Sequence, residues 1–304
     1  MNVKALGIFI LMPMLLLGLS AQAASLCAKV HPRASTVSIL IDSENALSES
    51  EKLSLTSNLG KFSGWLGEAQ IYESMSALKI TTTVRGAQFV HKDRSLQANP
   101  NIFGNAQNRQ MKSFAVVIFH EYTHAHLEIF LGKSVLGYKE FQKPSPENIL
   151  KKRRFEMLSG VHELVADMLP SLALKEPNIL EATLTGLDFS SKHYSRETTE
   201  KIRASRKFQD NKFTDAAIWK YEMERIEWLD GEWDAHMMFA FVRPKIWSRA
   251  LVLSQEKGTV EAQAYVKRIA RRLVDEIING KLNSPYMTLD TLKQIVDPIV
   301  DGIQ

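Results

Sequence analysis

The segment of residues 114–126, FAVVIFHEYTHAH, constrains the fold of this chain more than any other. It opens with apolar residues and then carries His120, Glu121 and His124, which form the pattern H-E-x-x-H. Positions i and i+4 of an α-helix lie one above the other on the same face, so both imidazoles can reach a single metal ion. Glu121 leans toward the same side. The segment therefore predicts a helix that enters from the protein interior and presents two metal ligands.

A second helical segment, residues 159–167, carries two carboxylates, Glu163 and Asp167, at the same spacing. Their neighbours are almost all apolar, and a carboxylate is costly to bury in such surroundings unless it is paired or bound to a metal. The simplest solution makes Glu163 the third metal ligand and Asp167 the acceptor of a hydrogen bond that fixes the tautomer of a ligand histidine. The alternative is a salt bridge or an exposed helix face.

Together, His120-Glu121-Tyr122-Thr123-His124 and the later Glu163-Leu164-Val165-Ala166-Asp167 resemble the gluzincins, the thermolysin-like group of zinc metallopeptidases. The resemblance covers about ten residues and implies a zincin-like fold. It implies Zn²⁺ bound by His120, His124 and Glu163, with Glu121 as general base. Asp167 would orient the first histidine.

Other histidines of these two segments fit a ligand role less well. A metzincin would place a third histidine six residues after His124, where this chain has Phe130. His126 lies about 200° round the helix from His124, and His162 points about 100° away from its neighbour Glu163. We therefore expect neither His126 nor His162 to bind the metal.

A hydrolase of this kind needs a donor for the developing oxyanion. His236 is the first candidate, because it begins a predicted helix and follows the acids Glu232 and Asp234. Tyr194 is the second candidate, and the alternative for His236 is an ordinary helix-start histidine. If residues 235–253 form one helix, Arg243 shares the face of His236 and could bind a substrate carboxylate.

Residues 1–23 have the pattern of a signal peptide. Lys4 precedes an apolar run of about fifteen residues, shorter than the roughly 20 that span a bilayer, and an A-x-A site ends at Ala23. We expect an exported protein, periplasmic or secreted, without a stable membrane anchor after cleavage. Leu26 precedes the single cysteine, Cys27, which argues against a lipoprotein site and allows no internal disulfide.

The remaining pattern predicts an α+β fold that is mostly α. Residues 24–135 would form an N-terminal lobe with a small antiparallel sheet and the H-E-x-x-H helix, and residues 136–304 a helical lobe. The expected elements are strands at 36–42, 78–85 and 87–91, a helix at 48–59, a loop at 93–105, a helix at 106–132, a helix from 145 that ends or kinks at Pro170, and helices through most of the rest. Residues 186–213 are polar and basic, as an exposed helix or loop would be.

A formal net charge of +4 is too small to argue for nucleic acid. The expected function is an exported zinc metallopeptidase that acts on a peptide or protein, with an edge strand from residues 78–91 holding the substrate. Two alternatives stay open: a non-catalytic binding protein with a zincin-like fold, and a zinc amidase that acts on cell-wall peptide.

Overall fold

A computed structural model describes most of the chain from residue 39 onward. The described ranges are 39–41, 47–68, 75–81, 84, 86–90, 92–105, 107–131, 149–185, 196–230, 234–280 and 289–303. The predicted signal peptide, Cys27, Tyr194 and the predicted helix start at residues 145–147 lie outside these ranges. Within the described residues, no helix combines the length and apolarity that a membrane span requires.

The sheet has four strands in the order β1-β2-β4-β3. Strands β1 (Ile39–Ile41), β2 (Ala77–Ile80) and β4 (Ser95–Ala98) run parallel, and β3 (Ala87–Val90) pairs with β4 in the antiparallel sense. The expected antiparallel sheet is therefore wrong: the sheet is mixed, because a helix crosses over between β1 and β2. The antiparallel strand β3 lies at one edge.

That crossover is helix α2, Glu49–Trp65. Ser48 caps it in a capping box, in which its side chain accepts from the Glu51 N–H and its own N–H donates to the Glu51 carboxylate. The helix runs through Gly60 and Gly64 to Trp65, beyond the end predicted at residue 59. Buried side chains on this helix, Phe62 among them, offset the helix-weakening cost of glycine.

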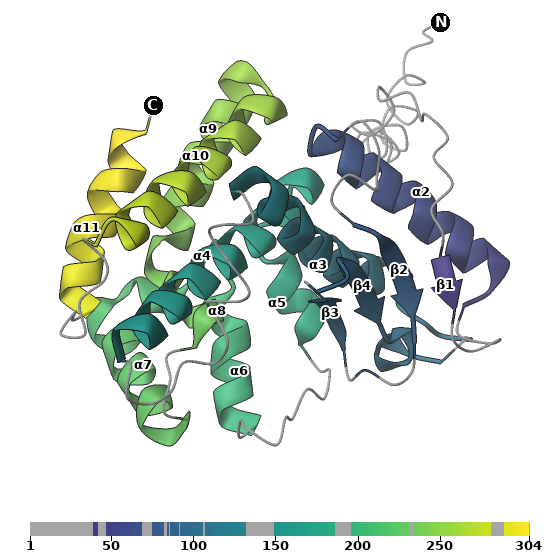
Figure 1. The fold of residues 1–304 in the computed structure, drawn as a ribbon, viewed down its shortest axis with the longest axis horizontal. Coiled ribbons are helices and arrows are strands. Elements are labelled where there is room, and N and C mark those ends of the chain that lie inside the picture. The colour runs from purple at the N-terminus through teal and green to yellow at the C-terminus, as the bar shows by residue number, and fades with distance from the viewer. Residues whose placement is uncertain are drawn as a thin grey trace, which may run out of the picture.

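Helix α3, Met111–Leu131, is the centre of the molecule. It packs on strands β3 and β4 on one side and on α4, Ile149–Leu174, on the other (Figure 1). Most of its residues are buried, as the apolar run in the sequence predicts. Helix α4 continues through Pro170 to Leu174, so of the two outcomes expected at that proline the helix end is wrong, and a kink there stays a prediction.

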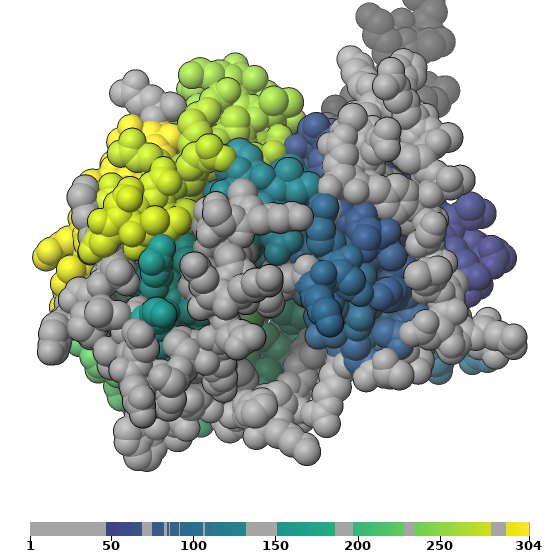
Figure 2. Space-filling view, in the orientation of Figure 1, coloured from purple at the N-terminus to yellow at the C-terminus, as the bar shows by residue number. Residues whose placement is uncertain are grey.

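The second half of the chain is helical and packs around α4, which contacts α8, α9 and α10. The remaining helices are α5 (Ile179–Leu184), α6 (Arg196–Ser205), α7 (Ala216–Asp230), α8 (Ala235–Met238), α9 (Arg243–Lys257), α10 (Thr259–Ile278) and α11 (Leu289–Gly302). The space-filling view shows the sheet region in blue and the C-terminal helices in yellow-green on opposite sides of one face (Figure 2). The described chain is therefore α+β and mostly α, as expected.

Two expected elements differ from the structure. The predicted loop at 93–105 contains strand β4 and a short 3₁₀ helix, Pro100–Phe103. The predicted single helix at 235–253 is broken into α8, a 3₁₀ turn at Ala240–Val242 and α9. Pro244, in the first turn of α9, has no N–H to continue a helix from α8.

Candidate metal centre

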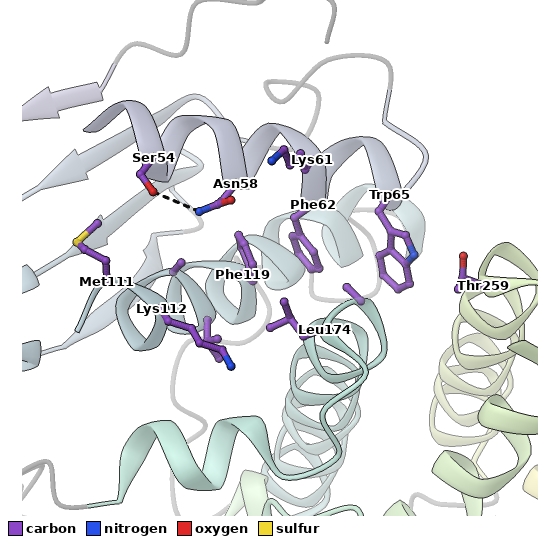
Figure 3. A pocket seen from close by; sticks show the side chains of 13 residues that line it. Ser54, Asn58, Lys61, Phe62, Trp65, Met111, Lys112, Phe119, Leu174 and Thr259 are labelled. Carbon is purple, nitrogen blue, oxygen red and sulfur yellow. Dashed lines mark hydrogen bonds between the residues drawn. The ribbon is translucent and has the colours of Figure 1, made fainter. Parts of the chain in front are cut away.

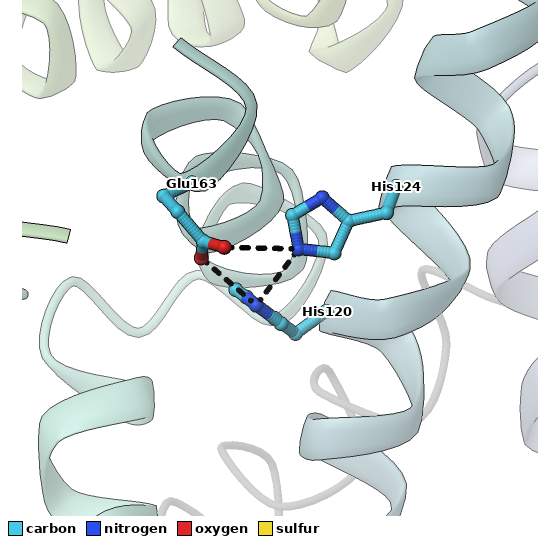
Figure 4. Close-up of side chains that lie close together, drawn as sticks. All are labelled: His120, His124 and Glu163. Atoms are coloured by element: carbon cyan, nitrogen blue, oxygen red, sulfur yellow. Dashed lines mark hydrogen bonds and ion pairs between the residues drawn. The ribbon is translucent and has the colours of Figure 1, made fainter. Parts of the chain in front are cut away.

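Three side chains from α3 and α4 converge at the contact between these helices. His120 and His124 lie one turn apart on α3, and Glu163 faces them from α4 (Figure 4). The two Nε2 atoms lie 3.2 Å apart. Glu163 Oε2 lies 3.3 Å from His120 Nε2, and Glu163 Oε1 lies 3.5 Å from His124 Nε2. These are the only His, Cys, Asp and Glu residues in the described part of the chain that are grouped closely enough to hold a metal ion.

This triangle has the size that a tetrahedral zinc ion requires. Zinc binds imidazole nitrogen at about 2.0–2.1 Å, which places neighbouring ligand atoms about 3.3 Å apart in a tetrahedral site. The three observed separations fall on either side of that value. Two histidines and one carboxylate also leave one tetrahedral position for water or substrate.

The second ring nitrogen of His120 faces Asp167. His120 Nδ1 lies 3.0 Å from Asp167 Oδ1. A proton held on Nδ1 by this carboxylate leaves the lone pair on Nε2, which points at the other two ligand candidates. Glu163 Oε2 is buried, and its close contacts are two imidazole nitrogens, His120 Nε2 at 3.3 Å and His236 Nε2 at 3.1 Å. Both features fit a donor set arranged for a cation.

Asp167 is fully buried between two arginines. Arg206 contacts both carboxylate oxygens at 2.5–3.1 Å, and Arg243 Nη1 lies 2.7 Å from Oδ2. Burial acts to raise the pKa of Asp167, but the two guanidinium groups hold it well below its usual value. The Asp167 carboxylate therefore contacts the His120 ring and also neutralises the two arginines.

Both arginines differ from the roles predicted for them from the sequence. Arg243 is fully buried and its second amino group donates to the backbone carbonyl of His236 at 3.1 Å, so it is not free to bind a substrate carboxylate. The broken helix between these two residues removes the shared face that the prediction assumed. Arg206 was part of a basic segment expected to be solvated, yet it is only 7% exposed.

Glu121 lies beside the metal-ligand candidates without belonging to their triangle. Its Oε2 accepts a hydrogen bond from the backbone N–H of Phe89, on edge strand β3, at 2.9 Å. Burial raises the pKa of Glu121 to about 7, and the nearby Glu163 adds to this effect. A carboxyl group with this pKa can both take up and release a proton near neutral pH.

His236 reaches the centre from the short helix α8. Its Nε2 lies 3.1 Å from Glu163 Oε2, and its Nδ1 lies 3.6 Å from the Asp234 carboxylate. Burial opposes protonation, but Glu163 and Asp234 together raise the pKa of His236 to about 10. The side chain keeps 31% of its surface exposed.

The remaining histidines of the two helices lie outside the triangle. His126 Nδ1 lies 2.5 Å from Glu68 Oε1, on a different face of α3. His162 stacks against the ring of His124, with centroids 5.8 Å apart and planes at 7°. Neither joins the group that could hold a metal, in agreement with the expectation from helix geometry.

Sequence reasoning missed Arg206, which contacts the site directly. Its terminal nitrogen lies 3.1 Å from His120 Nδ1 as well as against Asp167. One sequence signal was available. Arg206 directly follows α6 and shares the buried face of Ile202 and Ser205. A carboxylate that is predicted to be buried also needs a partner cation.

Comparison of the chain with protein-family models, with curated proteins and with solved structures finds no match. The class of the protein therefore rests on the site itself.

Proposed function

We propose that this chain is an exported zinc metallopeptidase of the gluzincin kind, with a zincin-like arrangement around α3. The observation that carries the proposal is the triangle of His120, His124 and Glu163 ligand atoms, with separations of 3.2–3.5 Å. Two imidazoles and a carboxylate are a ligand set that catalytic zinc sites use. Bound zinc would acidify a water molecule and polarise the carbonyl group of the substrate.

The chain's own residues supply the proton transfers. Glu121 would take the proton of the attacking water and pass it to the leaving amine, for which a pKa of about 7 is suitable. His236 would donate a hydrogen bond to the oxyanion that develops on the substrate carbonyl. Asp167 would hold His120 in the tautomer that leaves Nε2 free for the metal.

The position of β3 supports a peptide as substrate. Among the residues that the structure describes, this strand ends the sheet, and the N–H of Phe89 is directed at Glu121 rather than at β4. An extended peptide that adds to the free edge of β3 would pass close to Glu121. Protein and cell-wall peptide share this backbone, so both belong in the assay.

Two variants separate catalysis from metal binding. Glu121→Gln keeps the ligand triangle and is expected to retain zinc while hydrolysis falls by about 10²–10⁴-fold. His120→Ala removes a ligand and is expected to lose both zinc and hydrolysis. The measurement is zinc content of the purified proteins beside hydrolysis of casein and of muropeptides.

Full activity in Glu121→Gln would contradict the catalytic proposal and favour the non-catalytic binding protein. Hydrolysis of muropeptides but not of casein would favour the zinc amidase that acts on cell-wall peptide over the peptidase.

A further inference from the structure

A cavity lies beside the first half of α3, and none of the three metal-ligand candidates lines it. It has a volume of about 360 Å³ and is lined by four helices, α2, α3, the end of α4 and the start of α10 (Figure 3). Pockets that hold small molecules begin at about this size. The α3 residues that line the cavity, Ala115, Val116 and Phe119 among them, all precede His120 along the helix.

One wall of the cavity is aromatic. Phe62 stacks on Phe119 with ring centroids 4.5 Å apart, and Trp65 follows Phe62 at 6.0 Å. Leu174, at the end of α4, faces these rings. This wall offers a hydrocarbon tail a continuous apolar surface, which is the main source of affinity in such a pocket.

The charged groups of the cavity are of one sign. Among the described lining residues there are two lysines, Lys61 and Lys112, and no acid. Lys112 pairs with Glu176 at 2.7 Å. Lys61 is exposed and makes no ion pair or hydrogen bond with any residue that the structure describes. Asn58, which lies about one turn before Lys61 on α2, also lines the cavity.

We propose that this cavity binds a small amphipathic carboxylate. The hydrocarbon tail lies against Phe62, Trp65 and Phe119, and the carboxylate lies at the rim against Lys61. Tail burial provides the affinity, and the Lys61 ammonium group, which has no ion-pair partner among the described residues, selects an anion over a neutral molecule of the same length. This site is separate from the metal centre and does not depend on its chemistry.

The test is isothermal titration calorimetry of the mature full chain with monomeric decanoate, with decanol as the uncharged probe of equal length. We expect saturable binding of decanoate and weaker binding of decanol. Lys61→Glu should weaken decanoate binding by about tenfold, because it replaces an attraction by a repulsion. Lys92→Glu is the matched control, since Lys92 is exposed and does not line the cavity, and it should leave the affinity unchanged.

A second variant, Ala173→Phe, places a ring in the cavity and should abolish decanoate binding, with the fold checked by circular dichroism. Vesicles of phosphatidylglycerol distinguish a free amphiphile from a lipid surface. Binding to vesicles without binding of monomeric decanoate would overturn the proposal. Equal affinity for decanol, or decanoate binding that neither Lys61→Glu nor Ala173→Phe changes, would also overturn it.

Discussion

Asp167 lies between His120, one of the metal-ligand candidates, and two buried arginines. It contacts Nδ1 of His120 on one side and the guanidinium groups of Arg206 and Arg243 on the other. Removal of its charge would leave two cations in the interior without a counter-ion. A buried ion pair that loses one partner costs about 3–5 kcal/mol, far more than an exposed pair contributes.

We therefore predict that Asp167→Asn lowers the free energy of unfolding by about 3–5 kcal/mol and weakens zinc binding by about 10–100-fold. Urea unfolding and zinc competition measure the two effects. The matched control is Asp301→Asn, because the Asp301 side chain is 62% exposed and pairs with a surface lysine. An equal effect of both substitutions would contradict the role of Asp167.

The difference in free energy of unfolding between wild type and Asp167→Asn should depend on pH in one direction. The folded pKa of Asp167 is lowered, so its charge stabilises the fold above the unfolded pKa of about 3.9. As the pH falls below about 4, this contribution is progressively lost. The stability difference between wild type and Asp167→Asn should accordingly shrink in acid.

The proposed role of His236 is to donate a hydrogen bond to the oxyanion that forms during hydrolysis. We predict that His236→Gln lowers kcat by about 10²–10³-fold while zinc content stays unchanged, because it removes a donor to the oxyanion and no metal ligand. Steady-state kinetics and metal analysis provide the measurement. Loss of zinc in this variant would instead make His236 part of the metal site.

Spacing along two helices was sufficient to predict which side chains come together between α3 and α4. His120, His124, Glu163 and Asp167 follow from i, i+4 periodicity in apolar surroundings, which depends only on local geometry. Arg206 and Arg243 did not follow, because their burial depends on packing between helices far apart in the sequence. A polar pattern does not distinguish a solvated arginine from one that neutralises a buried acid.

At the scale of elements, α8 is held against α4 by a close approach at Gly160. A methyl group on Gly160 would lie 3.0 Å from both the Cβ and the sulfur of Met238 and 3.0 Å from the ring of Phe239. This contact is one turn before Glu163 on α4 and just after His236 on α8. It therefore sets the distance between these two side chains.

Gly160→Ala is predicted to move α8 away from α4, with hydrolysis falling more than about tenfold and stability falling by about 1–3 kcal/mol. Zinc content should stay unchanged, since all three ligands lie on α3 and α4. Gly302→Ala is the control, because no atom lies within 4 Å of the added methyl group. Unchanged kinetics in Gly160→Ala would show that the contact does not position His236.

The elements that the sequence predicted well are those with a strong local signal. Helix α3 has a long apolar run, and α2 has a capping box at Ser48. Strand β4 was missed because Ser95 and Gln97 are polar, yet it lies between β2 and β3 in the sheet. Its pairing, and the parallel direction of its neighbours, depend on contacts distant in sequence that no local pattern contains.

At the scale of the whole molecule, the candidate metal centre lies where the two halves meet. Helix α3 belongs to the packing of the sheet, and α4 belongs to the helices that follow it. A metal ion bound by His120, His124 and Glu163 would cross-link these two helices. A ligand that binds only the folded chain stabilises it by mass action.

Chelation should therefore destabilise the folded chain. With free zinc at about 100 times its dissociation constant, bound metal contributes about 2.7 kcal/mol, so removal of zinc lowers the melting temperature by several degrees. Differential scanning calorimetry with and without a chelator measures the shift, and added zinc should reverse it. His120→Ala, which lacks a ligand, should show no such shift.

The most direct test of the account is the position of the metal in a crystal of the zinc-loaded protein, located by anomalous scattering at the zinc edge. We predict one site, with His120 Nε2, His124 Nε2 and a Glu163 carboxylate oxygen each about 2.0–2.2 Å from the ion. No peak between these residues, or a peak ligated by a different set of side chains, would contradict it.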